Sequence, residues 1–380
     1  ISTITSTAPR AYAIADKLKS LGVTVIMGGP HVSYLTDEAL EHCDFVIRGE
    51  GEQPLMQFMD AWEGPRDFSN VSSLSFRKED QIVHNPLGEF EQKLDNVPFP
   101  DFSLSRVKRK RVLGQLTIPI QTSRGCPFDC SFCSVTGMFG KQYRHRSTEN
   151  VIAELKQYNE RNNFIFFYDD NFTANRRMAK ELLHAMINEG FHFQWSTQVR
   201  VDVAKDPELL DLMKQAGCHT VFIGLESVNP ESLKAMKKNQ TVEQIEFGIQ
   251  EIQKRKIHVH GMFVFGFDED NPKTVKGTVR FAMKNKLTSV QFLILTPLPG
   301  SELYKTMERE KRIKFCDWSL YDTHHVVFEP TNFSVWGLQR AQIWGHKKFY
   351  SLSETVKKFS RGAWVALGIA AYAMVLRRLR

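Results

Sequence analysis

The chain has 380 residues, enough for two or three domains. Its hydrophobic content of 42% and charged content of 24% are those of a globular protein and exclude a disordered chain, while its net charge of +7 permits an anionic partner. It has only six cysteines, and three of them, Cys43, Cys218 and Cys316, lie far apart in the sequence. This usage excludes the disulfide framework of a small secreted protein and predicts a cytoplasmic protein in a reducing compartment.

Residues 1–63 alternate between helical and strand-like patterns. In chain order, the segments are "RAYAIADKLKSLG" (helix), "VTVIMGG" (strand), "DEALEHC" (helix), "DFVIRGEGE" (strand and glycine turn) and "QPLMQFMDAWEG" (helix). This order predicts a parallel sheet with crossover helices, but with too few strands for a complete doubly wound sheet. We therefore expect the C-terminal half of a Rossmann-like domain, truncated before Ile1, with Thr5 and Thr7 in its first strand.

A hairpin and a linker follow this series. "SLSFRKEDQIVHN" predicts two strands that turn at Glu79 and Asp80, which completes a first domain over residues 1–88. Residues 89–115 form a predicted linker, with the Pro-rich stretch "DNVPFPDFS" and the basic run "RVKRKR". A basic run in a linker is usually solvated, and no aromatic base-stacking pattern accompanies this one, so we expect no nucleic acid partner.

A second alternating series covers residues 116–310. Its strand-like runs are "LTIPIQTS", "FIFFYDDN", "FQWSTQVR", "TVFIGLES", "HVHGMFVFGF" and "SVQFLILTP". Its helical stretches cover residues 152–158, 178–188, 208–215, 242–255 and 274–284. The series predicts a partial (βα)6 TIM-like barrel, an α/β fold in which the chemistry lies at the C-terminal ends of the strands.

Residues 311–380 are expected to form an α-rich C-terminal region. Its uncharged run, residues 362–376, is shorter than the ~18 to 20 apolar residues that cross a bilayer. Two interpretations stay open: an interfacial amphipathic helix in peripheral contact with the inner face of the membrane, or a helix docked on the protein's own core. In the first, the cations at headgroup level are Lys357, Lys358, Arg361, Arg377, Arg378 and Arg380.

The loop "CPFDCSFC" follows the first barrel strand and holds Cys126, Cys130 and Cys133. A disulfide would use two of these thiols and leave the third unpaired. Structural zinc prefers four ligands, and no fourth Cys or His lies at the spacing of a zinc finger. Three thiolates in so tight a loop fit a cubane iron–sulfur cluster that is one cysteine short of its usual four ligands. Zinc or a chance grouping is the alternative. In the cluster interpretation one iron stays open to a ligand that the protein does not supply.

At these residues the chain resembles the radical S-adenosylmethionine (radical SAM) superfamily, whose signature is CxxxCxxC with an aromatic residue before the last Cys, here Phe132. The N-terminal "VIMGGPH" and "FVIRGEGEQP" resemble the cobalamin (B12)-binding domain that precedes the barrel in one subgroup. The resemblance implies that Cys126, Cys130 and Cys133 bind a [4Fe-4S] cluster. It also implies that SAM chelates the open iron and is cleaved by one electron to a 5′-deoxyadenosyl radical.

The resemblance further implies candidate SAM contacts at three strand ends. Asp169 and Asp170 stand where many members carry a glycine-glycine-glutamate, and either is a candidate for the SAM ammonium group. A helix N-cap is the alternative role for both carboxylates.

Five more residues are singled out on the later strands. Ser196 and Gln198 share one face of their strand and are candidates for the ribose hydroxyls. Arg200 is a candidate for the SAM carboxylate, or else pairs with a nearby acid. Glu226 ends an apolar strand and is expected near the ribose or amine of SAM. His260 is either a core histidine or a residue that contacts substrate.

The resemblance assigns the cobalamin contacts to the N-terminal domain. Gly28 and Gly29 follow one strand, and Gly49 and Glu50 follow the next, so their backbone is expected beside the nucleotide tail of the cofactor. A Gly-Gly-Pro turn of ordinary structural origin is the alternative for the first pair.

The function implied is that of a cobalamin-dependent radical SAM enzyme, a methyltransferase that modifies an unactivated carbon. The alternatives are a radical SAM cyclase or rearrangement enzyme without net methyl transfer and, in another class, a non-catalytic iron–sulfur electron-transfer protein. The partners implied are a one-electron reductant such as flavodoxin or ferredoxin and a small-molecule substrate. The aromatic residues and the cationic end of the tail suggest that this substrate is a lipid.

Overall fold

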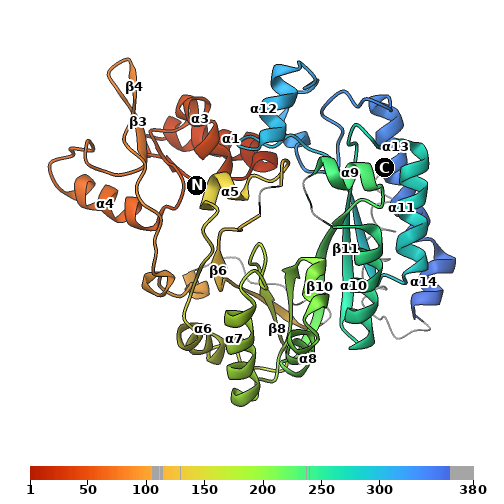
Figure 1. The fold of residues 1–380 in the computed structure, drawn as a ribbon. Helices are drawn as coiled ribbons and strands as arrows, with labels where there is room; N and C mark the ends of the chain where they lie inside the picture. Colours follow the sequence, from red (N-terminus) through yellow and green to blue (C-terminus); the bar gives the residue numbers. More distant parts are fainter. Residues whose placement is uncertain (105–110, 112–113, 129, 237, 239, 360–380) are drawn as a thin grey trace. The chain divides into compact units, whose positions relative to one another are not determined.

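The computed structural model describes residues 1–104, 111, 114–128, 130–236, 238 and 240–359. The chain forms two compact units (Figure 1). The N-terminal unit comprises Ile1–Val97, Gly125–Gln142 and Thr296–Glu329. The barrel unit comprises Pro98–Arg124, Tyr143–Leu295 and the chain from Pro330 onward. We call residues 125–142 the cysteine loop, and it belongs to the N-terminal unit.

The N-terminal unit contains a four-stranded sheet in the order β1-β2-β3-β4. Strands β1 (Ile26–Met27) and β2 (Phe45–Ile47) are parallel, and β3 (Leu74–Lys78) and β4 (Gln81–His84) form the antiparallel hairpin that the sequence predicts. The predicted strand at Thr5 and Thr7 is wrong. Those residues form a 3-10 turn, η1 (Thr5–Thr7), because the chain pairs with the sheet only through an isolated bridge from Ser2 to Gly28.

Helices cover both faces of this sheet. The remaining elements of the unit are α1 (Ala8–Ser20), α2 (Pro30–Tyr34), α3 (Thr36–His42), α4 (Glu52–Glu63), η2 (Leu94–Asn96), α5 (Val135–Phe139), α12 (Glu302–Arg309) and η5 (Trp318–Leu320). Val46 points to a core of small and aliphatic side chains under α1 and α3. Its neighbours on β2, Phe45 and Ile47, point to an aromatic core that includes Phe58 of α4. This alternation gives a three-layered α/β domain.

The barrel unit contains six parallel strands in the order β12-β11-β10-β9-β8-β5, which confirms the predicted half-barrel. Their bounds are β5 (Leu116–Ile120), β8 (Asn163–Phe167), β9 (Gln194–Val199), β10 (Cys218–Glu226), β11 (His258–Phe265) and β12 (Ser289–Ile294). The helices are α6 (Thr148–Lys156), α7 (Arg176–Glu189), α8 (Pro207–Gln215), α9 (Pro230–Ala235), α10 (Val242–Lys254), α11 (Pro272–Lys284), α13 (Val335–Phe349) and α14 (Leu352–Phe359), with 3-10 turns η3 (Phe102–Leu104) and η4 (Val201–Lys205). Figure 1 shows the long helices along the outer side of the sheet.

Side-chain alternation gives the sheet one packed face and one partly open face. Ile165 and Phe167 of β8 are fully buried on the helix side, where Phe167 meets the ring of Trp195. Phe164 and Phe166 point to the other face and are only half-buried. We call this second, concave side the inner face.

Polar caps fix where each barrel helix begins. The N-cap side chains of α6, α7, α8, α9, α10, α11 and α13 belong to Ser147, Asn175, Asp206, Asn229, Thr241, Asn271 and Ser334, and each accepts a backbone N–H of its helix. These caps end the loops that follow the strands. The polar residues at the C-terminal strand ends are thereby kept at one edge of the sheet.

The chain leaves the barrel unit through a narrow neck. Strands β6 (Ser123–Arg124) and β7 (Arg144–His145) pair in antiparallel register, with Ser123 opposite His145. Gly125 has a φ of +83°, and a Cβ there would overlap the backbone carbonyl of Gln142. Only glycine at position 125 allows the backbone of the two segments, at Gly125 and at Gln142, to approach this closely.

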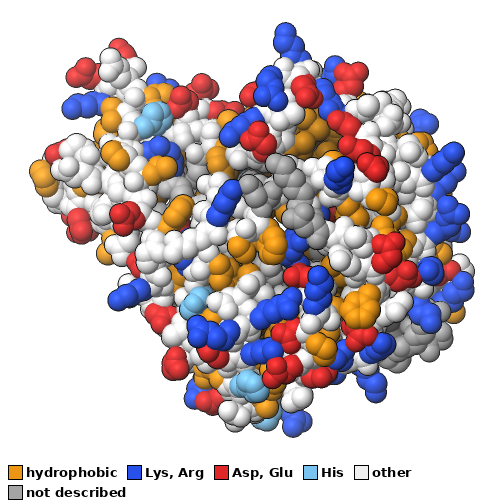
Figure 2. Space-filling view, viewed as in Figure 1, with side chains coloured by type: hydrophobic (Ala, Val, Ile, Leu, Met, Phe, Trp, Pro, Cys, Tyr) orange, Lys and Arg blue, Asp and Glu red, His pale blue; other side chains and the backbone are white. Residues whose placement is uncertain are grey.

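The described part of the C-terminal region packs on the barrel. Among the residues that the structure describes, no helix is long and apolar enough to cross a membrane. Lys358, expected at headgroup level, instead lies with its Nζ 3.2 Å from the ring centre of Phe349, and burial lowers its pKa to about 7. Residues 360–380 and the basic run 106–110 lie outside the described residues. Figure 2 shows Lys and Arg mixed with Asp and Glu on the face that it draws, rather than gathered in one patch.

Candidate functional site

The three clustered cysteines lie in one turn of the cysteine loop. Cys126, Cys130 and Cys133 are half-buried, and none of them forms a disulfide. The backbone N–H of Cys133 donates to the carbonyl of Cys130 over 3.1 Å, which closes the turn between the last two sulfurs. Within the described residues no three His, Cys, Asp or Glu side chains already stand close enough to hold a metal ion.

The chemistry of the donor set fits a cluster with one open iron. The three thiols share one short loop, and two of the other cysteines, Cys43 and Cys218, are buried in the core. Burial raises the pKa of Cys43 to about 12 and also raises the pKa of Cys218, so these two are inert core thiols. A cubane iron–sulfur cluster held by Cys126, Cys130 and Cys133 would keep its fourth iron for another ligand.

Asp169, at the end of β8, holds the base of the cysteine loop. Its Oδ1 accepts from the backbone N–H and the hydroxyl of Thr122, over 2.9 and 3.1 Å, and from both donors of Ser123. The residue is 1% exposed, and its Oδ2 has no hydrogen-bond partner among the described residues. Asp169 is not a helix N-cap, and one of its oxygens is already used by its own chain. Asp170 is exposed, and its predicted role stays a prediction.

A buried ion pair holds the same segment from the side of α6. Arg146 donates from Nη1 to the carbonyl of Gln121 over 2.8 Å and to Glu154 Oε2 over 2.5 Å. Its backbone N–H donates to the carbonyl of Thr122 over 2.9 Å. Glu154 is only 1% exposed on an otherwise apolar helix face. The sequence does contain a signal for this pair, a carboxylate among the buried positions of α6, but the prediction missed it.

The polar residues of β9 alternate as predicted. Ser196 and Gln198 share one face, and Thr197 points the other way, where its hydroxyl donates to the carbonyl of Phe167. The side-chain amide of Gln198 donates to the backbone carbonyl of Asp169 over 3.3 Å. Arg200 donates to the carbonyl of Lys238 over 2.8 Å and has its Nε 3.7 Å from Asp202 Oδ1. The planar fork of Arg200 is therefore partly engaged within the barrel unit.

Glu226 forms a buried ion pair that the sequence prediction missed. Lys238 Nζ lies 2.7 Å from Glu226 Oε1, and both side chains are 8% exposed. Glu226 has a φ of +59°, which strains any residue but glycine, and the register between β10 and β11 shifts beside it. A Cβ at Gly224 would overlap the carboxylate of Glu226 and lie 3.0 Å from Lys238 Nζ. The strand end is thus shaped around this pair.

His260 lies on the inner face of the half-barrel. Its ring centre is 4.8 Å from that of Phe222, and its Nδ1 is 2.7 Å from Ser289 Oγ. Its Nε2 is buried with no hydrogen-bond partner among the described residues. Burial lowers its pKa to about 4, so the imidazole is neutral at physiological pH.

Packing within the protein explains one of the glycines predicted to contact cobalamin, whereas another has open space beside it. Gly29 has a φ of +98°, and a Cβ there would come within 2.6 Å of the Thr3 carbonyl, so packing alone explains this glycine. Gly28 makes only ordinary contacts. Gly49 has a φ of +74°, with nothing within 4 Å of the position of a Cβ, which leaves room for a ligand beside the end of β2. Glu50 accepts from the backbone N–H of Glu91 over 3.2 Å.

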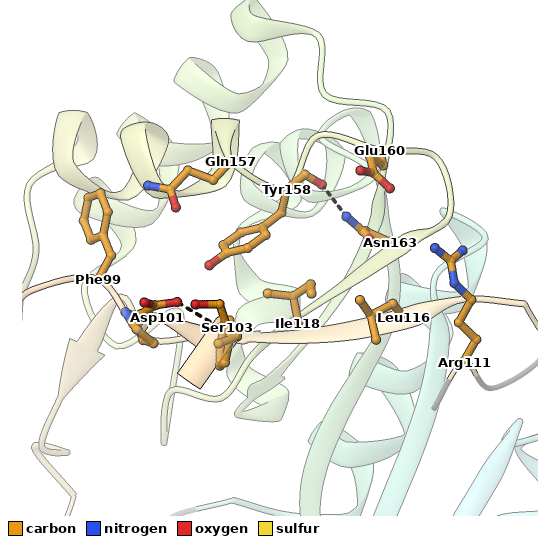
Figure 3. A pocket seen from close by; sticks show the side chains of 12 residues that line it. Phe99, Asp101, Ser103, Arg111, Leu116, Ile118, Gln157, Tyr158, Glu160 and Asn163 are labelled. Carbon is orange, nitrogen blue, oxygen red and sulfur yellow. Dashed lines mark hydrogen bonds between the residues drawn. The ribbon is translucent and has the colours of Figure 1, made fainter. Parts of the chain in front are cut away.

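A groove of about 790 Å³ lies elsewhere on the barrel unit (Figure 3). Leu116 and Asn163, which line it, are the first residues of β5 and β8. It is therefore at the N-terminal ends of these strands, away from Asp169. Chemistry in barrels of this kind lies at the opposite end.

Comparisons with known proteins agree with this geometry. The sequence model of the Radical SAM superfamily matches residues 120–282, and that of the B12 binding domain matches residues 1–59. An uncharacterised methyltransferase of Pyrococcus horikoshii is 32% identical over 341 residues, which cover 88% of this chain and 74% of the relative. The bacteriochlorophyllide d C-12(1)-methyltransferase of Chlorobaculum tepidum is 33% identical over 335 residues, covering 87% of this chain and 69% of the relative.

A solved structure shares the fold. The radical SAM methyltransferase TsrM from Kitasatospora setae, determined with cobalamin and a [4Fe-4S] cluster bound, superimposes with a TM-score of 0.69 at 22% sequence identity. The match covers 80% of this chain and 63% of that one, so the chain spans less than two thirds of its length.

A parallel half-barrel with a three-cysteine loop and an adjoining α/β domain defines an enzyme of the iron–sulfur and SAM-dependent class. The chain belongs to the radical SAM superfamily and carries a B12 binding domain. Its cofactors are accordingly a [4Fe-4S] cluster, SAM and cobalamin.

The substitution Asp169→Asn tests the buried carboxylate through pH. Burial raises the pKa of Asp169 from 3.8 to about 6, so in that window the folded protein binds more protons here than the unfolded chain. The stability that protonation confers is complete below about pH 4 and is lost as pH rises through about 6, a change on the order of 3 kcal/mol. The melting temperature of the wild type minus that of Asp169→Asn should fall across this window and stay constant above it.

Asp270→Asn is the matched control. Burial raises the pKa of Asp270 to about 6 as well, but its carboxylate accepts from Ser232 and from the backbone of Gly266 and Phe267. This variant should show a similar pH effect and normal iron uptake, whereas Asp169→Asn should take up less iron. A melting difference for Asp169→Asn that is independent of pH contradicts the assignment.

Removing one member of the Glu226–Lys238 pair should destabilise the barrel strongly. Lys238→Met leaves a buried carboxylate without its cation, a loss of ~3–5 kcal/mol in the free energy of unfolding. The double variant Glu226→Gln/Lys238→Met leaves no buried charge and should lose much less. Urea unfolding of the wild type, both single variants and the double variant measures the coupling. Additive losses would show that the two side chains do not interact.

Proposed function

We propose that this protein is a cobalamin-dependent radical SAM methyltransferase that adds a methyl group to an unactivated carbon of an apolar small molecule. The observation that carries the proposal is that the cysteine loop belongs to the same compact unit as the B12 binding domain. When bound, the cluster supplies one electron for the reductive cleavage of SAM and cobalamin supplies the methyl group.

The chain's own residues hold the reactants in this proposal. Cys126, Cys130 and Cys133 ligate the cluster, with Phe132 packed beside the last of them. Gly28, Gly29, Gly49 and Glu50 lie along the cobalamin tail, and the open space at Gly49 supports this placement.

The SAM contacts come from the C-terminal strand ends of the barrel. Asp170 is the accessible carboxylate for the SAM ammonium, because Asp169 already binds the base of the loop. Ser196 and Gln198 serve the ribose, and Arg200 serves the carboxylate of SAM. Glu226 contributes indirectly to SAM binding. Its ion pair with Lys238 fixes the conformation of the C-terminal end of β10.

The inner face of the half-barrel favours an apolar substrate. Phe166 and Phe222 meet edge to face, with ring centres 5.7 Å apart, and Phe222 in turn meets His260. A neutral imidazole and two phenyl rings form a wall with no charge, which suits a hydrophobic or conjugated molecule. A one-electron reductant such as flavodoxin or ferredoxin would supply the electron that reduces the cluster.

Product analysis tests the proposal without knowledge of the substrate. Anaerobically reconstituted protein, reduced in the presence of SAM and hydroxocobalamin, should form both S-adenosylhomocysteine, from methylation of cobalamin, and 5′-deoxyadenosine. A cyclase or rearrangement enzyme would form 5′-deoxyadenosine alone. An electron-transfer protein would form neither.

Cysteine variants supply the control. Cys126→Ala, Cys130→Ala and Cys133→Ala should each reduce 5′-deoxyadenosine to background, because the cluster loses a ligand. Cys316→Ala removes an exposed cysteine outside the loop and should leave the yield unchanged. Unchanged yields from the three loop variants would refute the proposed chemistry.

A further inference from the structure

A short helix runs from the predicted cobalamin contacts toward the cysteine loop. Helix α2 begins directly after Gly29 and ends at Tyr34. Ser33, one residue before the end, donates its hydroxyl to the carbonyl of Gly29 over 2.9 Å and accepts the backbone N–H of Gly49 over 3.0 Å. The position of α2 therefore depends on the two glycine turns that end β1 and β2.

The last residue of this helix contacts the cysteine loop. Tyr34 donates its hydroxyl to the backbone carbonyl of Ser134 over 2.9 Å. Ser134 directly follows Cys133, whose N–H closes the turn on Cys130. A hydrogen bond that fixes the Ser134 carbonyl therefore fixes the last peptide of the turn that carries two of the three sulfurs.

Two glycines form a cradle for the Tyr34 side chain. A Cβ at Gly300 would overlap the Tyr34 ring, and a Cβ at Gly137 would lie 2.5 Å from the Tyr34 hydroxyl. Gly300 has a φ of +86°, a conformation that favours glycine. All of these residues belong to the N-terminal unit. The space for this side chain is thus provided by backbone on two sides.

The segment after Gly300 holds the loop a second time. The backbone N–H of Leu303, in the first turn of α12, donates to the carbonyl of Ser131 over 3.0 Å. The loop is therefore bound at Ser131 and at Ser134, on both sides of Cys133. These two contacts restrict where the Cys133 backbone can move.

We propose that Tyr34 is a positioning residue that couples the cobalamin-binding part of the N-terminal unit to the cysteine loop. A ligand that orders the turns at Gly29 and Gly49 orders α2, and through the Tyr34 hydroxyl it orders the turn that carries Cys130 and Cys133. The inference rests on the proposed use of both cofactors in one reaction. It adds a reciprocal effect: cobalamin changes how the cluster loop presents its open iron to SAM.

The hydroxyl of Tyr34 is suited to this role as a donor. Burial, and then the charge of the neighbouring Cys133, raise the pKa of Tyr34 to about 12, so it keeps its proton at physiological pH. Phenylalanine would fill the same glycine cradle and remove only the hydrogen bond. Tyr34→Phe is therefore a conservative test.

The matched control lies in the same unit. Tyr321 is buried and donates its hydroxyl to the backbone carbonyl of Phe315 over 2.9 Å, away from the loop. Tyr321→Phe removes a hydrogen bond of the same kind. Tyr321→Phe should leave the effect of cobalamin on binding at the cluster at its wild-type size.

The experiment measures the dissociation constant of a SAM analogue that cannot be cleaved, such as aza-SAM, for the reduced, reconstituted protein from the change in the EPR spectrum of the cluster, with and without hydroxocobalamin. In the wild type and Tyr321→Phe, cobalamin should change this constant by about five-fold, the size set by one hydrogen bond. In Tyr34→Phe the dissociation constants measured with and without cobalamin should have a ratio of about one, while iron content and cobalamin retention stay unchanged. An equal ratio in wild type and Tyr34→Phe overturns the inference.

Two further measurements separate the possible failures. A wild-type protein that retains no cobalamin on gel filtration refutes the proposed function and the coupling together, whereas retained cobalamin with no effect of Tyr34→Phe refutes the coupling alone. Hydrogen exchange on the wild type needs no variant to fold. Adding hydroxocobalamin should slow exchange in the peptide that covers residues 131–140, and unchanged exchange there contradicts the coupling.

Discussion

The Oδ1 atom of Asp169 accepts hydrogen bonds from both the backbone and the hydroxyl of Thr122 and Ser123, at the point where the chain leaves the barrel for the cysteine loop. Hydrogen bonds to a charged acceptor are worth ~1.5–3 kcal/mol each, yet burying the carboxylate raises its pKa and opposes them. The same segment is also held by Arg146, which pairs with Glu154 and donates to the carbonyls of Gln121 and Thr122, and by the pairing of β6 with β7. These contacts fix both ends of the cysteine loop where the chain leaves and re-enters the barrel unit.

Two further hydrogen bonds of the cysteine loop come from the unit that carries the B12 binding domain. Tyr34 and Leu303 hold it at Ser134 and Ser131, and the chain after the barrel contributes Trp318, whose indole N–H donates to Glu38 of the B12 binding domain. The covalent order places the loop within the barrel sequence, but its packing places it with the N-terminal unit. The methyl transfer that we propose would require the radical and the methyl group of cobalamin to reach the same substrate carbon. Building both cofactor sites into one compact unit limits how far they can move apart.

The sequence predicted what depends on local pattern. Apolar periodicity located the six barrel strands and their helices, and the turn residues Glu79 and Asp80 located the hairpin. It could not predict contacts between segments far apart in the chain. Oδ1 of Asp169 binds Thr122, 47 residues away, and Lys238 turns back to Glu226 across a strained strand end. Thr5 and Thr7 were expected in a strand, but they form a 3-10 turn, and the chain is bridged to the sheet before them, at Ser2. Lys358 lies at headgroup level only in the membrane interpretation of the tail, and in the structure it contacts an aromatic ring of the preceding helix.

The account depends on an iron–sulfur cluster that Cys126, Cys130 and Cys133 bind while one iron stays free of protein ligands. Mössbauer spectroscopy of protein reconstituted with ⁵⁷Fe, before and after SAM is added, tests this most directly. We expect one iron site to differ from the other three and to change its isomer shift when SAM binds. A spectrum of equivalent irons that SAM leaves unchanged, or a loop that takes up zinc in place of the cluster, would contradict the account.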